Sequence, residues 1–296
     1  MDSSAIKITT TIPDYYIRTA TQEDVAFVKN MVAQENWNLG ENDIDFFAEH
    51  YPNDLYIGVY KEEPIASFLR LLINDSFGFC GLFIVQEEYR DMKFGITLAL
   101  ETYKYQNADK FILGKDGVLD QVPMYEKNGF VTFHTNARLI GIAKSSSARI
   151  SKEIIFHAFS TDIPEEIFEF DKECFRTDRR EFLEKWFARE DLLGVYVSRE
   201  DVIQGYAAIR KAENGYVIGP IQCNTYGDAE ILIRHLSNII VGQQFYIEVP
   251  KNQPHFNCLM EDFELTEDFN FARMYNKKPK DIAINKIFGN LSCACG

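Results

Sequence analysis

A turn between two apolar segments, EEYRDMKFG at residues 87–95, carries the residue types that hold a phosphate group. The run GFCGLFIVQ before it has the composition of a buried strand, and ITLALETYKYQ after it has that of a helix. The first turn of a helix presents unpaired N–H groups and the positive end of the helix dipole, which attract a pyrophosphate. Arg90 would add a charge-assisted hydrogen bond. The alternative is an ordinary charged turn between a strand and a helix.

This turn resembles the acetyl-CoA motif of the GNAT acetyltransferases, which reads Arg or Gln, two residues, Gly, one residue, Gly. Arg90 and Gly95 match its ends, but Lys93 replaces the first glycine and Asp91 stands where many members carry a further one. Fewer glycines limit how closely the backbone approaches a phosphate. The resemblance implies that acetyl-CoA is held by these residues: Phe83, Ile84, Val85, Arg90, Asp91, Met92, Lys93, Phe94, Gly95 and Thr97.

A second motif, DGVLDQVPMYEKNGF at residues 116–130, resembles the C-terminal segment of GNAT domains, and Tyr125, Gly129 and Phe130 match it. The resemblance implies that Tyr125 is catalytic and protonates the departing CoA thiolate, a task for a phenol at hydrogen-bond distance. The alternative is a partly buried tyrosine whose hydroxyl binds a backbone group. The sequence names no clear general base, although Glu87 and Asp116 lie near the matched motifs.

Candidate substrate-binding residues come from both halves of the chain. The segment AQENWNLGENDIDFF resembles a loop of tandem GNAT proteins, which implies that Trp37 and Asn38 line the acceptor side. In the second half, Asp178, Arg179 and Arg210 belong to an unusual polar set with Arg176 nearby. If the resemblance holds, the carboxylate would attract an ammonium group and a guanidinium would bind a carboxylate. The alternative is surface ion pairing.

The elements that must position these residues occur twice. A strand-like YYIRTA precedes Thr21, Asp24 and a helical segment, and a strand-like IIFHAFS precedes Asp162, Pro164 and another helical segment. Two hairpin patterns follow, LYIGVYKEEPIASFLRLL and LLGVYVSREDVIQGYAAIR. The copies end on GFVTFHTNARLI and DFELTEDFNFARMY, which share Ala-Arg and two apolar residues. Two copies of one unit are therefore expected.

The predicted fold class is α/β (α+β), with two tandem GNAT-like domains, each a mixed, mostly antiparallel sheet flanked by helices. We expect an N-terminal acetyl-CoA-binding domain at residues 1–143 and a divergent C-terminal domain at 152–296, joined by the Ser-rich connector AKSSSARIS. The second domain lacks the glycine-containing turn, and Pro220 has no N–H, so it is the weaker candidate for pyrophosphate. A cleft between the domains is a favoured place for a ligand.

Composition narrows the function. The net charge of -14 argues against nucleic-acid and anionic-membrane surfaces and favours a small or cationic partner. The first residues lack a signal-peptide pattern, no apolar run approaches membrane length, and a cytoplasmic monomer or homodimer is expected. Scattered histidines and the absence of HExxH predict no metal, and the six cysteines are expected to be reduced. The tail LSCACG is expected to be mobile.

Together these features predict an N-acetyltransferase that moves an acetyl group from acetyl-CoA to the amine of a small, cationic acceptor. The alternative is a catalytically weak GNAT-fold module that binds a metabolite or a protein, suggested by Asp91 and Lys93 in the turn.

Overall fold

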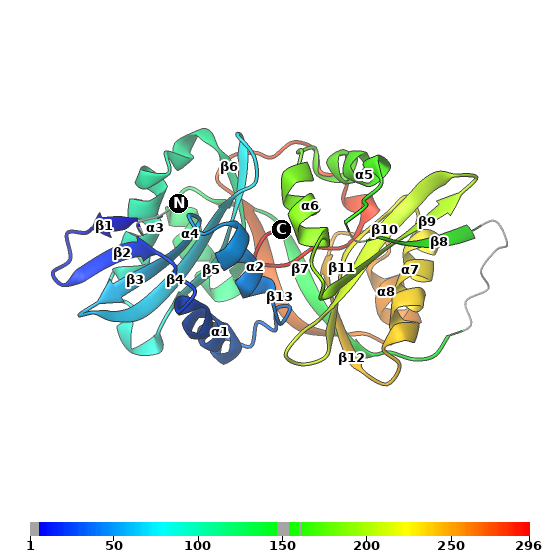
Figure 1. Ribbon diagram of the computed structural model, residues 1–296, viewed down its shortest axis with the longest axis horizontal. Helices are drawn as coiled ribbons and strands as arrows, with labels where there is room; N and C mark the ends of the chain where they lie inside the picture. The colour runs from blue at the N-terminus through cyan, green and yellow to red at the C-terminus, as the bar shows by residue number, and fades with distance from the viewer. Residues whose placement is uncertain (1–5, 147–153, 160) are drawn as a thin grey trace.

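The computed structural model describes residues 6–146, 154–159 and 161–296 (Figure 1). A single mixed sheet runs through the whole molecule in the order β1-β2-β3-β4-β5-β6-β13-β7-β12-β11-β10-β9-β8, with β14 added to β11. Among these strands, β5 with β6 and β11 with β12 pair in parallel, and the other neighbours are antiparallel. The predicted mixed, mostly antiparallel class is confirmed.

Most of the first half of the sheet comes from the first half of the chain, with helices on both faces. Its elements are β1 (Lys7–Thr9), β2 (Tyr15–Thr19), α1 (Asp24–Gln34), α2 (Asp43–His50), β3 (Leu55–Tyr60), β4 (Glu63–Leu72), β5 (Phe77–Val85), α3 (Phe94–Tyr105), β6 (Ile112–Val118), α4 (Val122–Lys127) and β7 (Val131–Ile142).

The second half repeats this order. Its elements are β8 (Ile154–Phe159), α5 (Glu165–Phe175), α6 (Arg180–Phe187), β9 (Leu192–Arg199), β10 (Val202–Lys211), β11 (Tyr216–Cys223), α7 (Tyr226–Ile239), β12 (Gln244–Pro250), α8 (Phe256–Asp262), β13 (Thr266–Tyr275) and β14 (Ile287–Gly289).

The predicted hairpins share one turn geometry. Lys61 and Glu62 between β3 and β4 both have positive φ, as do Glu200 and Asp201 between β9 and β10. Two consecutive positive φ values give the type I′ turn, whose twist matches that of the flanking strands. The duplicated unit thus keeps its turn type although the turn sequences differ.

The predicted helix starts differ in detail from the structure. α1 begins at Asp24, whose carboxylate accepts hydrogen bonds from the backbone N–H and the hydroxyl of Thr21 at 2.7 and 2.9 Å. α5 begins at Glu165 directly after Pro164, and no side chain caps it. Asp162, which the sequence pattern places before this helix, therefore does not cap it.

The two halves exchange their last long strands. β13 pairs with β6 of the first half on one side and with β7 on the other. β7 in turn pairs with β12 of the second half, in a register that sets Arg138 opposite Glu248. Each half completes its sheet only with a strand of the other, and the division at residues 143–152 is a division of the chain and not of the sheet.

The prediction of a mobile tail was wrong. β14 pairs with β11, and the residues after it run between the halves, where Leu291, Ala294 and Cys295 are buried. The backbone of the tail passes so close to Gly81 that a Cβ on this glycine would overlap the carbonyl of Ala294. Apolar burial and this close backbone approach hold the segment in place.

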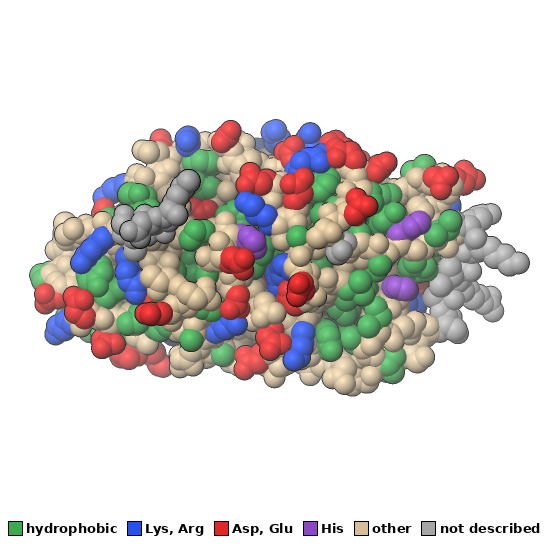
Figure 2. Space-filling view, in the orientation of Figure 1, with side chains coloured by type: hydrophobic (Ala, Val, Ile, Leu, Met, Phe, Trp, Pro, Cys, Tyr) green, Lys and Arg blue, Asp and Glu red, His purple; other side chains and the backbone are tan. Residues whose placement is uncertain are grey.

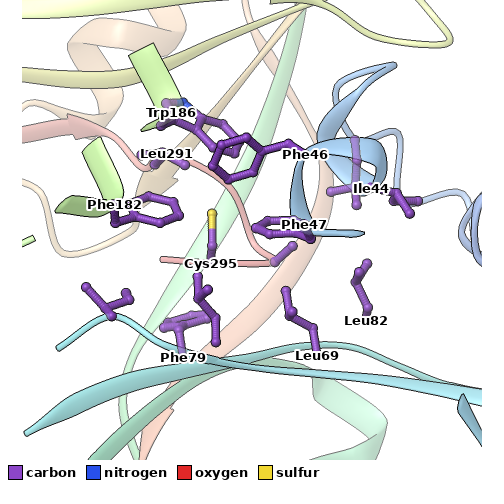
Figure 3. Packing of buried hydrophobic residues seen from close by; sticks show 14 of the residues in the cluster. Ile44, Phe46, Phe47, Leu69, Phe79, Leu82, Phe182, Trp186, Leu291 and Cys295 are labelled. Carbon is purple, nitrogen blue, oxygen red and sulfur yellow. The ribbon is translucent and has the colours of Figure 1, made fainter. Parts of the chain in front are cut away.

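The tail is part of a hydrophobic cluster that joins the halves (Figure 3). Phe46 and Phe47 on α2 meet Trp186 on α6, and the ring centroids of Phe46 and Trp186 lie 5.0 Å apart in an edge arrangement. Cys295 lies between these rings and Phe79 on β5, as Figure 3 shows. The halves therefore share one core.

Charges of both signs lie on the surface of the molecule (Figure 2). No helix in the described part of the chain is long and apolar enough to cross a membrane. On the face shown in Figure 2, Lys and Arg side chains are scattered among Asp and Glu. Among the described residues, no group of three or more His, Cys, Asp or Glu side chains is placed to hold a metal ion. The six cysteines form no disulfide.

Candidate active site

The candidate site is the place where β5 and β6 separate. The two strands pair in parallel from Phe77 with Ile112 to Cys80 with Lys115, and no further pair follows. Leu82 in β5 has a φ of 49°, which marks the bend of the strand away from its neighbour. The gap opens into a cavity of about 500 Å³ lined by residues of both halves, which we call the β5–β6 cavity.

The cavity has two sides because it passes through the sheet. Lys115 and Tyr125 lie on the side of α3 and α4, together with Phe83 and the turn before α3. Asp116, the next residue of β6, points to the opposite side, which carries the tail and α2. Ligands entering from the two sides would meet at the gap between the strands.

The turn before α3 has the backbone conformation of a glycine-rich loop, although two of its positions are not glycine. Asp91 and Lys93 have φ values of 63° and 67°, in the left-handed region that glycine favours. A side chain in this region costs on the order of 1 kcal/mol per residue, so the loop conformation is kept at an energetic cost. Gly95 begins α3 behind it, where a Cβ would lie 2.9 Å from the side chain of Val85.

The guanidinium of Arg90 already has two partners within the protein. Its Nε donates to the carbonyl of Val85 at 3.0 Å, and its Nη2 forms an ion pair with Glu35, which follows α1. Both side chains are partly exposed. An incoming phosphate would therefore compete with a carboxylate for this guanidinium.

Eight of the ten residues predicted to hold acetyl-CoA line the cavity. They are Phe83, Ile84, Val85, Arg90, Asp91, Lys93, Phe94 and Gly95. Met92 is exposed outside it, and Thr97 lies within α3, where its N–H bonds the carbonyl of Lys93. Ile96 lines the cavity instead.

Tyr125 lies at the inner end of the cavity, on α4. Gly117 makes room for it, since a Cβ there would lie 2.7 Å from the tyrosine ring. The ammonium nitrogen of Lys115 sits 3.3 Å from the centroid of the same ring, and Phe130 and Phe83 are further ring neighbours at 4.7 and 5.7 Å. Burial raises the pKa of Tyr125 and lowers the pKa of Lys115 to about 7.

On the opposite side, aromatic rings and buried charges form the wall. Trp37, Phe269 and Phe271 supply the rings. Arg138 on β7 holds this wall together, because its guanidinium bonds Asp268 at 2.7 Å and the carbonyls of Trp37 and Asn36 at 2.8 and 3.0 Å.

Two carboxylates face this side. Asp116 is tied to Arg273 by hydrogen bonds of 2.6 and 2.8 Å and accepts another from Asn136. Glu248 on β12 is buried, and its Oε2 has no hydrogen-bond partner among the described residues. Burial raises the pKa of Glu248 to about 7, helped by Asp116 and opposed by Arg138 and Arg210.

The structure places the other predicted substrate-binding residues away from this cavity. Asn38 bonds the backbone of Asn214 in the β10–β11 turn, whereas Trp37 beside it lines the cavity. Arg210 is buried and bonds Asp43 at 2.9 and 3.0 Å.

Arg179 and Asp178 line a different, smaller cavity between α5 and the end of β13. Arg179 is buried in a two-bond ion pair with Asp171 at 3.0 and 2.6 Å. Asp178 is exposed and lies 3.7 Å from Lys172. The two side chains therefore share a cavity with each other but not with Tyr125.

The second half has an equivalent gap, and its own chain fills it. β11 and β12 pair at Tyr216 and Val217 and then separate. β14 pairs with β11 in the gap, and the N–H of Asn290 bonds the carbonyl of Glu248 on β12 at 2.7 Å. The backbone N–H and C=O groups to which an extended ligand could bind in this second gap are thus already paired within the chain.

Sequence reasoning missed Lys115, Arg138 and Glu248. Arg138 and Glu248 are the single charges of NARLI and YIEVP, and Lys115 stands beside Asp116 in GKDGV; the other residues of these segments are uncharged. A lone charge in such a strand is seldom buried without a partner or a function, and this signal was present in the sequence.

Comparisons with known proteins agree with this geometry. The family described as an acetyltransferase (GNAT) domain matches residues 167–289. The holothin acyltransferase of Pseudoalteromonas sp. (strain SANK 73390) is 26% identical over 271 residues, which are 91% of this chain and 90% of that protein.

Two solved structures share the fold. A putative acetyltransferase from Pyrococcus horikoshii superposes with a TM-score of 0.80 at 18% identity, over 97% of this chain and 98% of its own. A tandem GNAT protein from the clavulanic acid biosynthesis pathway has a TM-score of 0.62 at 9% identity, over 90% and 100% of the two chains. With the repeated unit and the separated parallel strands, these matches lead to one conclusion: residues 167–289 match the GNAT acetyltransferase domain family, and the whole chain has the fold of tandem GNAT proteins.

Proposed function

We propose that the protein transfers an acetyl group from acetyl-CoA to the amine of a small, cationic acceptor, with the first half of the chain as the cofactor-binding domain. A GNAT acyltransferase uses an acyl-CoA donor, and the observation that carries the proposal is the β5–β6 cavity with its turn and helix N-terminus at one end. The cytoplasmic location stays a prediction.

In the proposed complex, the phosphates lie at the turn of residues 90–95, where the first N–H groups of α3 are unpaired. Lys93 supplies a positive charge at this point, and Arg90 would exchange Glu35 for a phosphate oxygen. The pantetheine arm follows β5 from Val85 inward, where the backbone no longer pairs with β6. An acetyl group suits the narrow end beside Tyr125 because rings close it.

The acceptor would approach from the side of Trp37, Phe269 and Phe271. Aromatic rings favour a flat or apolar body, and the carboxylates of Asp116 and Glu248 favour an ammonium group. The net charge of -14 attracts cations to the molecule as a whole. The relative is named for acyl transfer to holothin, which supports acyl transfer here.

Calorimetric titration with acetyl-CoA tests the donor. We expect saturable binding of one molecule per chain, because β14 closes the gap in the second half. Arg90→Ala would weaken binding about tenfold or more, since a charge-assisted bond contributes roughly 1.5–3 kcal/mol. Arg180→Ala removes an exposed arginine from the second half and serves as the matched control.

Two results would count against the proposal. Absence of binding by the wild type would refute the donor, and binding of two molecules per chain would refute the role given to β14. A panel of primary amines, followed by release of free CoA thiol, then identifies the acceptor class. Acidic amines that react faster than cationic ones would overturn the proposed acceptor chemistry.

A further inference from the structure

Lys115 is the most unusual charged group in the molecule. It lies at the last pair of β5 with β6, opposite Cys80, and only 6% of it is exposed. It forms no ion pair among the described residues, whereas Asp116 beside it holds Arg273. Three aromatic rings surround its ammonium nitrogen instead.

Resting on the proposed function, the position of the cofactor places its sulfur beside this lysine. The phosphate turn starts just after Val85, and the apex of the gap lies at Cys80. Five strand residues span about 16 Å, along which an extended arm would run. The far end of the arm, which carries the thioester, then lies at the apex, where Lys115 and Tyr125 meet.

We propose that Lys115 is the catalytic proton donor, and that its ammonium group, resting on the ring of Tyr125, protonates the CoA thiolate as it leaves. This assigns to Lys115 the step that the family resemblance gives to Tyr125. The phenol then serves as the platform that holds the ammonium in place.

The acidity of the two groups favours the lysine. A simple thiol such as that of cysteine has a pKa of about 8.5. Burial lowers the pKa of Lys115 to about 7, with Arg70 on β4 acting in the same direction and Cys80 in the opposite one. Burial raises the pKa of Tyr125, so this phenol is a weaker acid than the thiol it would protonate. Lys115 is therefore an acid of strength close to that of the thiol, whereas Tyr125 is a much weaker acid.

The step balances. The acceptor nitrogen forms a bond to the acyl carbon, the carbon–sulfur bond breaks, and its electron pair leaves on sulfur. The proton of Lys115 moves to that sulfur and gives free CoA thiol. The proton that the acceptor amine loses is returned through solvent to Lys115, so the enzyme regains its starting state.

The first experiment needs no acceptor. Free CoA is bound to the protein, and the ionisation of its thiol is followed by thiolate absorbance as the pH rises. An ammonium within about 4–6 Å lowers a thiol pKa by about 1–3 units, so the bound thiol should ionise at lower pH than free CoA. Lys115→Met should abolish this difference, whereas Tyr125→Phe should keep it.

Lys127→Met, on the exposed part of α4, is the matched control and should behave as the wild type. Lys115→Met should fold, because methionine is of similar length and carries no charge that burial would penalise. If the bound thiol ionises alike in the wild type and in Lys115→Met, the proposal is overturned. Failure of the wild type to bind CoA at all would instead refute the proposed function.

A kinetic experiment uses acetyl-CoA with phenethylamine, a small amine that fits the aromatic wall. Lys115→Met should lower kcat about 10²–10⁴-fold with little change in the KM for acetyl-CoA. Lys115→Arg should be as slow as Lys115→Met, since a guanidinium keeps its proton. The wild-type rate should fall above pH 7, because Lys115 then loses the proton that it donates. Loss of activity in Tyr125→Phe with an active Lys115→Met would return the role to the tyrosine.

Discussion

Asp43 on α2 is the buried carboxylate that joins the two halves of the chain. It accepts hydrogen bonds from Arg210 at 2.9 and 3.0 Å, from Arg189 at 2.8 Å and from the backbone N–H of Gly40 at 3.0 Å. Both arginines belong to the second half and are nearly or fully buried. We expect Asp43→Asn to lower the free energy of unfolding by about 3–5 kcal/mol.

The size of this stability loss follows from the hydrogen bonds and charges that an asparagine at position 43 would leave without a partner. Three of the four bonds come from charged donors, and at roughly 1.5–3 kcal/mol each they bound the loss from above. An asparagine keeps one acceptor oxygen but presents an NH₂ group to a guanidinium, so the buried Arg210 loses its counterion and Arg189 keeps only Asp191. A loss of this size is a third or more of the roughly 5–15 kcal/mol that stabilises a typical protein.

Denaturant unfolding measures this loss. Glu49→Gln makes the same chemical change at an exposed site on the same helix and should alter stability by less than about 0.5 kcal/mol. Burial alone would raise the pKa of Asp43, but Arg210 and Arg189 prevail and lower it. Its contribution is therefore present above the usual carboxyl pKa of about 4 and is lost as the pH falls below that. A loss under about 1 kcal/mol for Asp43→Asn would refute this reasoning.

Two further predictions concern the tail and β12. Gly81→Ala should release the tail and expose Cys295 to a thiol reagent, because the new Cβ overlaps the carbonyl of Ala294. Gly227→Ala, whose Cβ would lie 3.8 Å from its nearest neighbour, controls for the loss of a glycine, and equal labelling of both variants would contradict the packing. Burial raises the pKa of Glu248 from its ordinary value of 4.5 to about 7 in the folded protein, so ionising it costs stability as the pH rises from 4.5 to 7. Glu248→Gln should thus gain about 3 kcal/mol at pH 8 and nothing at pH 4, measured by urea unfolding; an equal effect at both pH values would exclude a titrating Glu248.

Local patterns predicted the elements that border the β5–β6 cavity. The apolar run of β5, the polar turn and the helical start of α3 are neighbours in sequence, and their geometry depends on local hydrogen bonds and steric limits. The same patterns could not show that Arg90 is bound by Glu35, which lies 55 positions earlier. Nor could they show that Asp91 and Lys93 keep a conformation typical of glycine, because the surrounding fold imposes it.

Contacts between segments that are distant in the chain could not be predicted from the sequence. A strand pattern indicates which side chains are buried but not which strand lies beside it. The sequence pattern therefore could not predict that β7 and β13 are exchanged between the halves. For the same reason Arg210 was read as a substrate ligand, although its partner Asp43 lies 167 positions away. The cysteine-rich tail was judged by its composition, and its burial depends on the space that Gly81 leaves.

The exchange of strands sets the order in which this protein can be made. While a ribosome synthesises the chain, β6 has an open edge from the time it forms until residues 266–275 emerge, because β13 is its neighbour. The first half alone is therefore an incomplete sheet with an exposed strand, the kind of surface that pairs with other chains. Folding of this edge of the sheet has to wait for nearly the whole sequence, and a truncated chain ending before β13 would lack Phe269 and Phe271 in the wall of the β5–β6 cavity.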